Sequence, residues 1–241
     1  MDRFAHIVRV FTVIGISGWA LFTGTPTQAS ISASSFPAIE VSQVVRPQSQ
    51  AAKFNQAAID HYNAGQRLQA LRLWKGHAEE GNPEAQFILG VLYYRGNAGL
   101  GKDVIESLCW YRRAAEQGHM NAQYNLGIHY ATGNGPARDP VAAVQWWRMA
   151  AVQGHVEAQF NLGLFYSEGT GVSPDPVEAV KWWGLAAEQG LAAAQFNLGL
   201  MYMKGEGIDE NPDEAIRLWR LSADQGFAQA ITVLRVLQLA P

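Results

Sequence analysis

Apolar and small residues recur along this chain in a helical pattern that repeats every 36 or 37 residues. In one copy Ala158, Leu162 and Gly163 stand at i, i+4 and i+5, which places them on one stripe of a helix. A glycine turn follows at 169–171, and a second apolar helical pattern runs over 175–190. Each copy therefore predicts two helices joined by a turn.

A six-residue phrase, Ala-Gln-aromatic-Asn-Leu-Gly, marks the first helix of each copy. It begins at Ala122, Ala158 and Ala194, and a looser version begins at Ala85. Self-similarity at this period is typical of stacked supersecondary units, in which each unit buries its apolar face against its neighbours. The fold class predicted is therefore all-α, built as an array of helical repeats.

Specific residues mark the ends of the second helices. An Asp-Pro or Asn-Pro pair opens three of them, at 139–140, 175–176 and 211–212. The Asp or Asn suits the N-cap position and the proline suits the first helical position. Each second helix then ends at a glycine, the residue that most readily adopts the left-handed backbone of a helix C-terminus. These are Gly118, Gly154, Gly190 and Gly226.

Large aromatic residues occupy one phase of the second helices. We interpret them as core residues that pack against the small Ala and Gly of the first helices. An aromatic box for a sugar or a quaternary amine is the alternative. The residues concerned are Trp74, Tyr111, Trp147, Trp183 and Trp219.

These motifs, in this order and spacing, resemble the Sel-1-like repeat family, which is related to tetratricopeptide repeats. The resemblance covers residues 85–229 in four copies, and residues 51–84 resemble a shorter tetratricopeptide-like unit. Residues 230–241 begin another copy but carry Arg235 where glycine is expected, which suits a capping helix with a polar outer face. The resemblance implies an α-α superhelix (helical-repeat solenoid) of about five helix pairs plus a C-terminal capping helix.

The N-terminal residues have the layout of a secretory signal peptide. Two arginines precede a short apolar run, and small residues at Thr27 and Ala29 suit cleavage after Ala29. An uncleaved membrane anchor is the alternative, but the run is shorter than the roughly 20 residues that span a bilayer. We expect a signal peptide at 1–29, a flexible linker at 30–50, a periplasmic or secreted location, and no stable membrane insertion.

Composition and motifs argue against several kinds of chemistry. The formal charge is −3 without a basic stripe, so nucleic acid is not an expected partner. The single cysteine, Cys109, rules out an internal disulfide and a cysteine-based zinc site, and we expect it to be buried. The Gly-x-Gly turns lack the lysine of a phosphate loop, and no catalytic motif is present in the mature chain. We predict no metal, no cofactor and no enzymatic activity.

The histidines and asparagines fit structural roles. His129 stands at a position otherwise filled by apolar residues, which favours a neutral histidine at the edge of the core. His119 and His155 follow helix-ending glycines and are expected to satisfy backbone groups. The asparagine of the repeated phrase is expected to tie adjacent repeats together by hydrogen bonds. Its copies are Asn125, Asn161 and Asn197.

One arc of each first helix is apolar although it points away from the second helix. Counting the first alanine as zero, this arc holds positions 2, 6, 9 and 10, and positions 9 and 10 vary between copies. In the resembled folds the arc lines the concave face, which can hold a peptide or a partner helix. Packing between neighbouring first helices is the alternative for positions 2 and 6. The candidate partner-binding residues are Phe87, Tyr94, Arg95, Tyr124, Ile128, Thr132, Phe160, Leu164, Glu168, Phe196, Leu200, Met203 and Lys204.

Two functional hypotheses follow. The first is an exported, non-catalytic scaffold or adaptor that binds a peptide or partner protein on its concave face. Family resemblance implies a narrower form, the regulation of an envelope sensor or a secretion complex. The second is a cell-wall or carbohydrate-acting protein, either a hydrolase or a binding module, supported by the tryptophan content. The sequence names neither the partner nor the organism, and it leaves the oligomeric state unknown.

Overall fold

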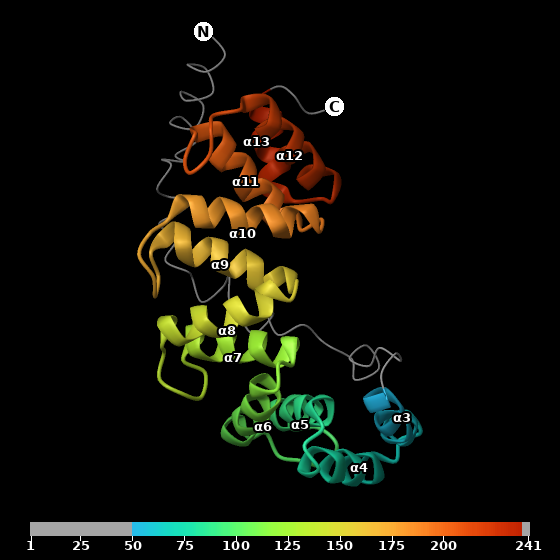
Figure 1. The fold of residues 1–241 in the computed structure, drawn as a ribbon. Coiled ribbons are helices and arrows are strands. Elements are labelled where there is room, and N and C mark those ends of the chain that lie inside the picture. The colour runs from blue at the N-terminus through green and yellow to red at the C-terminus, as the bar shows by residue number, and fades with distance from the viewer. Residues whose placement is uncertain (1–49, 238–241) are drawn as a thin grey trace. The chain divides into compact units, whose positions relative to one another are not determined.

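The computed structural model describes residues 50–237, and every regular element in this range is a helix (Figure 1). The predicted signal peptide and nearly all of the predicted linker lie outside the described residues, as do the last four residues of the predicted capping helix. Within the described range, no helix is both long and apolar enough to cross a membrane.

The helices are of similar length and follow one another through short turns. They are α3 (Gln50–Asn63), α4 (Arg67–Glu79), α5 (Pro83–Arg95), α6 (Val104–Glu116), α7 (Met120–Thr132), α8 (Pro140–Val152), α9 (Val156–Glu168), α10 (Pro176–Glu188), α11 (Ala192–Lys204), α12 (Pro212–Asp224) and α13 (Ala228–Val236).

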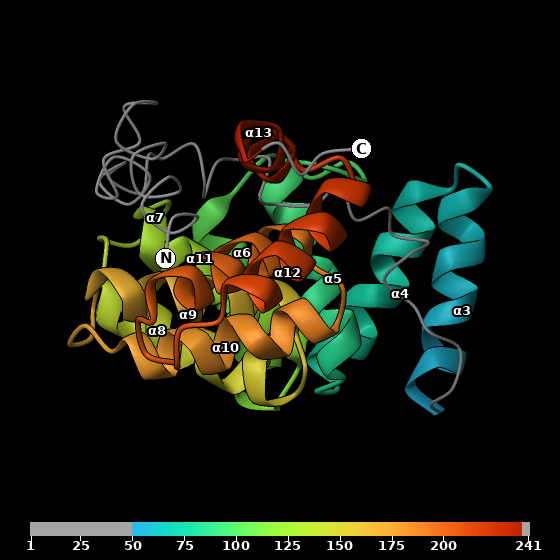
Figure 2. The same cartoon turned by 90° about the horizontal axis from the view of Figure 1, so that it is seen from above.

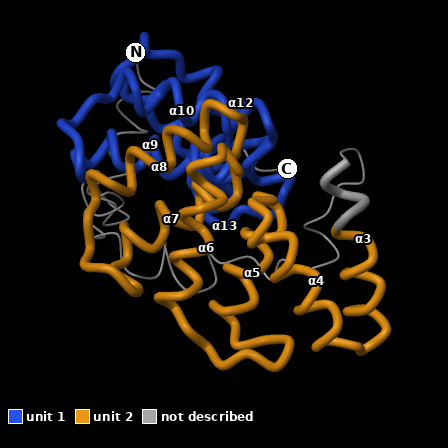
Figure 3. Tube along the Cα trace, turned by 60° about the horizontal axis from the view of Figure 1, so that its bottom comes forward, with its two compact units in different colours: residues 1–30, 156–241 blue, residues 31–155 orange. Residues whose placement is uncertain are grey.

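The chain divides into two compact units (Figure 3). Among the described residues, the N-terminal unit contains α3 to α8 and the C-terminal unit contains α9 to α13. Within each unit every helix packs against the next, as α3 and α4 do side by side in Figure 2. The helices form five pairs followed by the single helix α13. The predicted fold class, an all-α superhelix of about five helix pairs plus a capping helix, is confirmed.

Close packing inside a pair depends on a glycine facing an aromatic ring. A Cβ atom added to Gly163 of α9 would lie 2.4 Å from the Trp183 ring of α10, so this contact tolerates no side chain. The Trp183 indole nitrogen donates to the backbone oxygen of Phe160 at 3.2 Å. The same glycine and tryptophan meet in α7–α8 and in α11–α12. The core interpretation of the aromatic phase is confirmed, since its members are all buried: Trp74, Tyr111, Trp147, Trp183 and Trp219.

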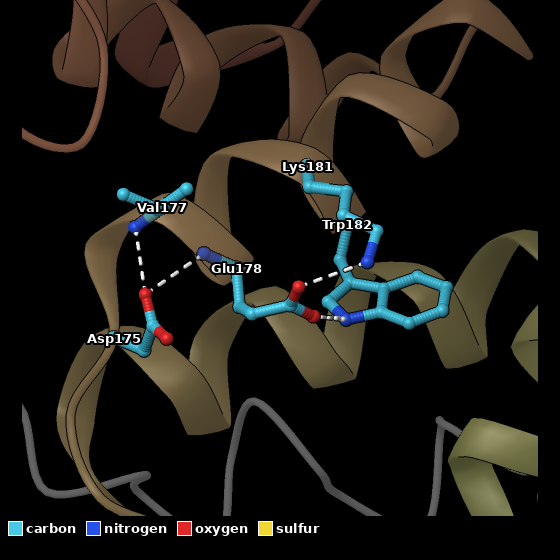
Figure 4. Close-up of polar contacts among 5 residues, drawn as sticks. All are labelled: Asp175, Val177, Glu178, Lys181 and Trp182. Carbon is cyan, nitrogen blue, oxygen red and sulfur yellow. Dashed lines mark hydrogen bonds and ion pairs between the residues drawn. The ribbon is translucent and has the colours of Figure 1, made fainter.

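The predicted helix ends are also confirmed, as α10 shows (Figure 4). Asp175 is the N-cap, and its Oδ1 accepts hydrogen bonds from the backbone N–H groups of Val177 and Glu178, each at 3.0 Å. The Glu178 carboxylate accepts hydrogen bonds from two side chains further along the same helix, Lys181 at 2.8 Å and Trp182 at 3.0 Å. The two bonds to Asp175 satisfy backbone N–H groups that the first turn of a helix leaves without partners.

Glutamine is the main hydrogen-bonding link between successive pairs. The Gln195 Nε2 of α11 donates to the Ala187 oxygen of α10 at 3.3 Å, and its Oε1 accepts from Gln225 after α12 at 2.9 Å. Gln86 and Gln123 make the corresponding bonds in the N-terminal unit. The sequence interpretation assigned such bonds to asparagine, and Asn125 of α7 does bond to Tyr111 of α6. It missed the glutamines, although both Ala-Gln and Gln-Gly recur at constant phase.

Cys109 differs from its expected placement. It lies on the exposed face of α6, next to the buried Trp110. One residue is a rotation of about 100° on a helix, so the neighbour of a core residue points well away from it. The expectation that Cys109 is buried was therefore wrong.

Candidate functional site

The predicted partner-binding residues separate into three groups by burial. Six are buried: Phe87, Tyr124, Ile128, Phe196, Leu200 and Met203. Five are half-buried: Tyr94, Thr132, Phe160, Leu164 and Glu168. Two are exposed: Arg95 and Lys204.

The aromatic of the repeated phrase packs against the beginning of the next helix pair. The aromatic was expected to point into an open groove. Its ring is covered instead by the residue that comes just before the first helix of the next pair. Three such contacts, given by their ring-centroid distances, are Phe87 with His119 at 4.6 Å, Tyr124 with His155 at 4.2 Å and Phe196 with Phe227 at 5.5 Å. These aromatics act in packing, and the prediction of partner binding is kept for the residues that retain exposure.

His119 has the backbone role that the sequence predicted. It is the N-cap of α7, and its Nδ1 accepts the backbone N–H of Ala122 at 3.2 Å. Because Nδ1 accepts, the ring proton is on Nε2, which donates to the Glu84 carboxylate of α5 at 3.1 Å. The histidine thus joins two helix pairs.

Residues near the ends of the first helices retain exposure and change from one copy to the next. We call this set the first-helix edge: Tyr94, Arg95, Thr132, Glu168 and Lys204. Each lies within two residues of the glycine that ends its helix, where the chain turns toward the second helix. The glycines beside these residues recur in every copy, whereas the edge residues themselves vary. Such an arrangement keeps the fold constant while the surface chemistry changes.

In the N-terminal unit the edge centres on Tyr94. Its hydroxyl accepts from the Asn134 side chain at 3.2 Å, and the Lys102 ammonium lies 5.4 Å from its ring centroid. Burial raises the pKa of Tyr94, against a smaller lowering by the Asn134 bond. Arg95 follows on the exposed side. This edge therefore carries a cation beside a neutral phenol.

In the C-terminal unit the edge carries both signs of charge. Burial raises the pKa of the Glu168 carboxyl, and a hydrogen bond from Thr170 opposes that shift. The Lys204 ammonium lies 3.6 Å from the Glu206 carboxylate. A partly buried carboxyl such as that of Glu168 gains more from a complementary partner than a fully hydrated one does.

His129 is a buried structural residue beside the N-terminal edge. Its side chain is fully buried, and Nδ1 donates to the Asn134 backbone oxygen at 2.6 Å. The Tyr94 ring meets it edge-on at 5.4 Å. Burial lowers the pKa of His129, which agrees with the neutral core histidine predicted. Among residues 50–237 no cluster of three or more His, Cys, Asp or Glu side chains is placed to hold a metal ion.

The sequence reasoning missed a pocket in the C-terminal unit. It has a volume of about 440 Å³ and lies between α10 and α12, over α11. Gly184 lies inside α10 at this pocket, and a Cβ atom added to it would meet nothing within 4 Å. The sequence signal was a glycine inside a helix, at a phase where the other copies carry a large side chain. We call this the Gly184 pocket; it is lined by Val180, Gly184, Ala187, Glu188, Gly190, Gln195, Leu198, Tyr202, Ile208, Glu214, Arg217, Leu218 and Leu221.

Helix pairs of similar length, joined by glutamine bonds and repeated at a constant period, define a helical-repeat protein. The family model of the Sel1 repeat matches residues 83–119, 121–155, 156–191 and 192–227, more than half of the chain. The protein belongs to the Sel1 repeat family. Proteins of this family generally mediate protein–protein interactions, and the repeat is generally a non-enzymatic scaffold.

Two solved structures place the chain beside bacterial relatives. A Sel1 repeat protein from Oxalobacter formigenes is 33% identical with a TM-score of 0.70, and the match covers 77% of each chain. A protective antigen of uropathogenic Escherichia coli, described as having an SLR fold, is 41% identical with a TM-score of 0.65. That match covers 68% of this chain but only 35% of the antigen. No curated protein matches the sequence significantly.

Proposed function

We propose that this protein is an exported, non-catalytic scaffold that binds a peptide or a partner protein through the first-helix edge of its repeats. The observation that carries the proposal is the contrast between the buried aromatic positions and the edge. Phe87, Tyr124 and Phe196 repeat on the first helices and are buried, whereas the accessible residues of the first-helix edge vary in charge and size. Membership of the Sel1 repeat family supports the interaction class.

Export rests on the sequence of residues 1–29, which has the layout of a signal peptide. An exported scaffold meets its partners in the cell envelope or outside the cell. We therefore propose regulation of an envelope sensor or a secretion complex as the narrower function, by analogy with the family.

Sugar binding through the tryptophans has less support than protein binding. A sugar-stacking platform needs an accessible ring face, whereas four of the tryptophans have no exposed surface. These are Trp74, Trp147, Trp183 and Trp219. The burial of these rings therefore favours protein binding over a cell-wall or carbohydrate-acting role.

The test compares charge reversals on and off the edge. The purified mature chain is used to capture proteins from envelope extract, and captured partners are identified by mass spectrometry. Arg95→Glu and Lys204→Glu are expected to reduce recovery of a specific partner by about tenfold each, since one reversed interfacial charge costs 1–2 kcal/mol or more. Arg72→Glu and Arg220→Glu make the same charge change at exposed positions on second helices and serve as matched controls.

Loss of recovery with the edge variants alone would support the proposal. Equal recovery by all four folded variants would place the binding surface elsewhere and refute the edge assignment. Circular dichroism at 222 nm checks that each variant keeps the helical fold.

A further inference from the structure

One side chain that the other repeats carry is missing at the Gly184 pocket. In the other second helices the residue after the core aromatic is a cation, namely Lys75, Arg112, Arg148 and Arg220. In α10 that position is Gly184. Glycine inside a helix is unfavourable by about 1 kcal/mol relative to alanine and is retained where close packing requires it. Packing does not require it here, since no atom lies within 4 Å of the Cβ position.

The repeated cation has a repeated partner. A tyrosine follows 18 residues after each of three cations and also after Gly184. These pairs are Lys75 and Tyr93, Arg112 and Tyr130, Arg148 and Tyr166, and Gly184 and Tyr202. In the N-terminal unit the pair is a physical contact: the Arg112 guanidinium donates to the Tyr130 hydroxyl, and the Lys75 ammonium lies 5.9 Å from the Tyr93 ring centroid.

At the Gly184 pocket the tyrosine is present and the cation of α10 is not. Tyr202 lines the pocket beside Gly184. The lysine of α10, Lys181, is bonded to Glu178 and lies 5.3 Å from the Trp182 ring centroid, and it is not among the lining residues (Figure 4). The position from which Arg112 reaches Tyr130 in α6 therefore carries no side chain in α10.

The charges at the rim favour an incoming cation. Glu188 lines the pocket and has no ion-pair partner among the described residues. Arg217 also lines it, but its guanidinium is held by both oxygens of Glu214 at 2.6 and 2.7 Å. The surrounding C-terminal unit carries five cationic and eleven acidic side chains over residues 156–237, a net charge of −6. A positively charged ligand is attracted to such a surface.

The walls suit the aliphatic part of an arginine. Val180, Leu198 and Leu221 present apolar surface between the polar groups. An arginine stem lies along apolar walls while its planar guanidinium donates to oxygen acceptors at the far end. Two of the lining residues, Tyr202 and Glu188, carry oxygens that can accept such bonds.

We propose that the Gly184 pocket binds an arginine side chain, flanked by apolar residues, of a partner polypeptide. The partner's arginine takes the place that a side chain of the protein itself occupies in the other repeats. The proposal rests on the scaffold function proposed above and adds a second contact on the second-helix face, separate from the first-helix edge. Arginine is among the residues that most often anchor protein interfaces.

The test uses the purified full chain and a defined peptide, acetyl-Ala-Leu-Arg-Leu-Ala-amide, followed by two-dimensional NMR. Saturable shifts of the Gly184 amide and the Tyr202 ring are expected, with a Kd of about 1 mM, as suits one anchored side chain. The same peptide with citrulline for arginine keeps the shape but loses the charge. It is expected to bind at least tenfold more weakly.

Two variants separate pocket filling from loss of fold. Gly184→Arg restores the residue of the other repeats and is expected to weaken binding at least tenfold, with resonances outside the pocket unchanged. Gly184→Ala adds only a methyl group to open space, and the variant is expected to bind the peptide within about twofold of the unmodified chain.

A third variant tests the acceptor. Tyr202→Phe removes one hydroxyl oxygen and is expected to weaken peptide binding severalfold.

Several outcomes would overturn the proposal. They are equal binding of the citrulline peptide, undiminished binding by Gly184→Arg, and absence of shifts at 10 mM peptide. Concentration-dependent shifts of Gly184 without peptide would show that a second copy fills the pocket, which also contradicts a separate partner. Arg95→Glu and Lys204→Glu are expected to leave the peptide affinity unchanged, so failure of this pocket and failure of the first-helix edge are distinguishable.

Discussion

At the scale of single residues, one buried position of the repeat is occupied by a titratable side chain in one copy and by apolar side chains in the others. His129 stands where the other copies have Leu92, Phe165 and Met201, so a titratable ring occupies a core position. Its Nδ1 bond to the Asn134 oxygen holds the neutral ring in place. The residue therefore stabilises the fold in a pH-dependent way that its apolar counterparts do not.

The pH dependence has a definite sign. Burial lowers the pKa of His129, so the folded chain binds the proton less tightly than the unfolded chain. The stability that His129 contributes is fully present above the unfolded value of about 6.5 and is lost as the pH falls toward the lower folded value. His129→Leu should remove this loss, which has a slope of at most about 1.4 kcal/mol per pH unit.

Thermal unfolding between pH 7.5 and pH 5.0 measures the effect. The unmodified chain is expected to lose more stability over this range than His129→Leu does. His77→Gln changes a partly exposed histidine on α4 and serves as the control. The same pH dependence in His129→Leu and the unmodified chain would contradict the assignment.

At the scale of the elements, one close contact and the N-cap of the second helix fix each of three helix pairs, α7–α8, α9–α10 and α11–α12. The first helix supplies a glycine, and the second supplies the tryptophan that donates to the opposite backbone. The caps then fix where each second helix begins, as Asp175 does for α10. Two glycines of the same α9–α10 pair have opposite effects on packing. Gly163 allows close contact with a tryptophan ring, whereas Gly184 leaves open space.

Alanine substitution at these two glycines should change stability in opposite directions. Gly163→Ala forces a methyl group to within 2.4 Å of the Trp183 ring and is expected to destabilise by about 1–3 kcal/mol. Gly184→Ala meets no atom and is expected to stabilise by roughly 0.5–1 kcal/mol through helix propensity. Urea unfolding measures both, and each variant is the other's control for the propensity gain. Stability changes of the same sign would refute the packing argument.

At the scale of the whole molecule, charge is divided between the two units. Residues 50–155 carry ten cationic and eight acidic side chains, a net charge of +2, against −6 for residues 156–237. The overall charge of −3 conceals this difference. An acidic C-terminal unit favours cationic partners, in agreement with the arginine proposed for the Gly184 pocket.

Export is the prediction that concerns the chain as a whole. Expressed with its own N-terminus in a bacterium with two membranes, the protein should be recovered from the periplasm or medium as a chain beginning at Ser30. Intact mass spectrometry of the fractionated cells measures this. Ala29→Asp should block processing, because the residue before the cleavage site must be small and neutral. Full-length chain held in the membrane fraction would instead support the uncleaved anchor.

The sequence predicted the fold far better than the candidate site. Repetition at a fixed period reveals which residues share an environment, so Gly163, Trp183 and Asp175 were each placed correctly from one copy and checked against the others. Repetition does not reveal what covers a residue. Phe87 was expected in an open groove because its own helix pair leaves it uncovered, whereas His119 of the next pair stacks on it. Cys109 was misplaced because adjacent residues on a helix point about 100° apart, so the neighbour of a buried tryptophan can be exposed.

The sequence by itself determined the helix pairs, their caps, the tryptophan core and the membership of a repeat family. These features depend on local spacing and on contacts within one repeat, which periodicity encodes directly. The tertiary structure alone decided which apolar positions stay accessible, that glutamine links the pairs, and that Gly184 opens a pocket beside Tyr202. Those features depend on how one helix pair covers the next, and therefore on contacts between side chains that are distant in sequence.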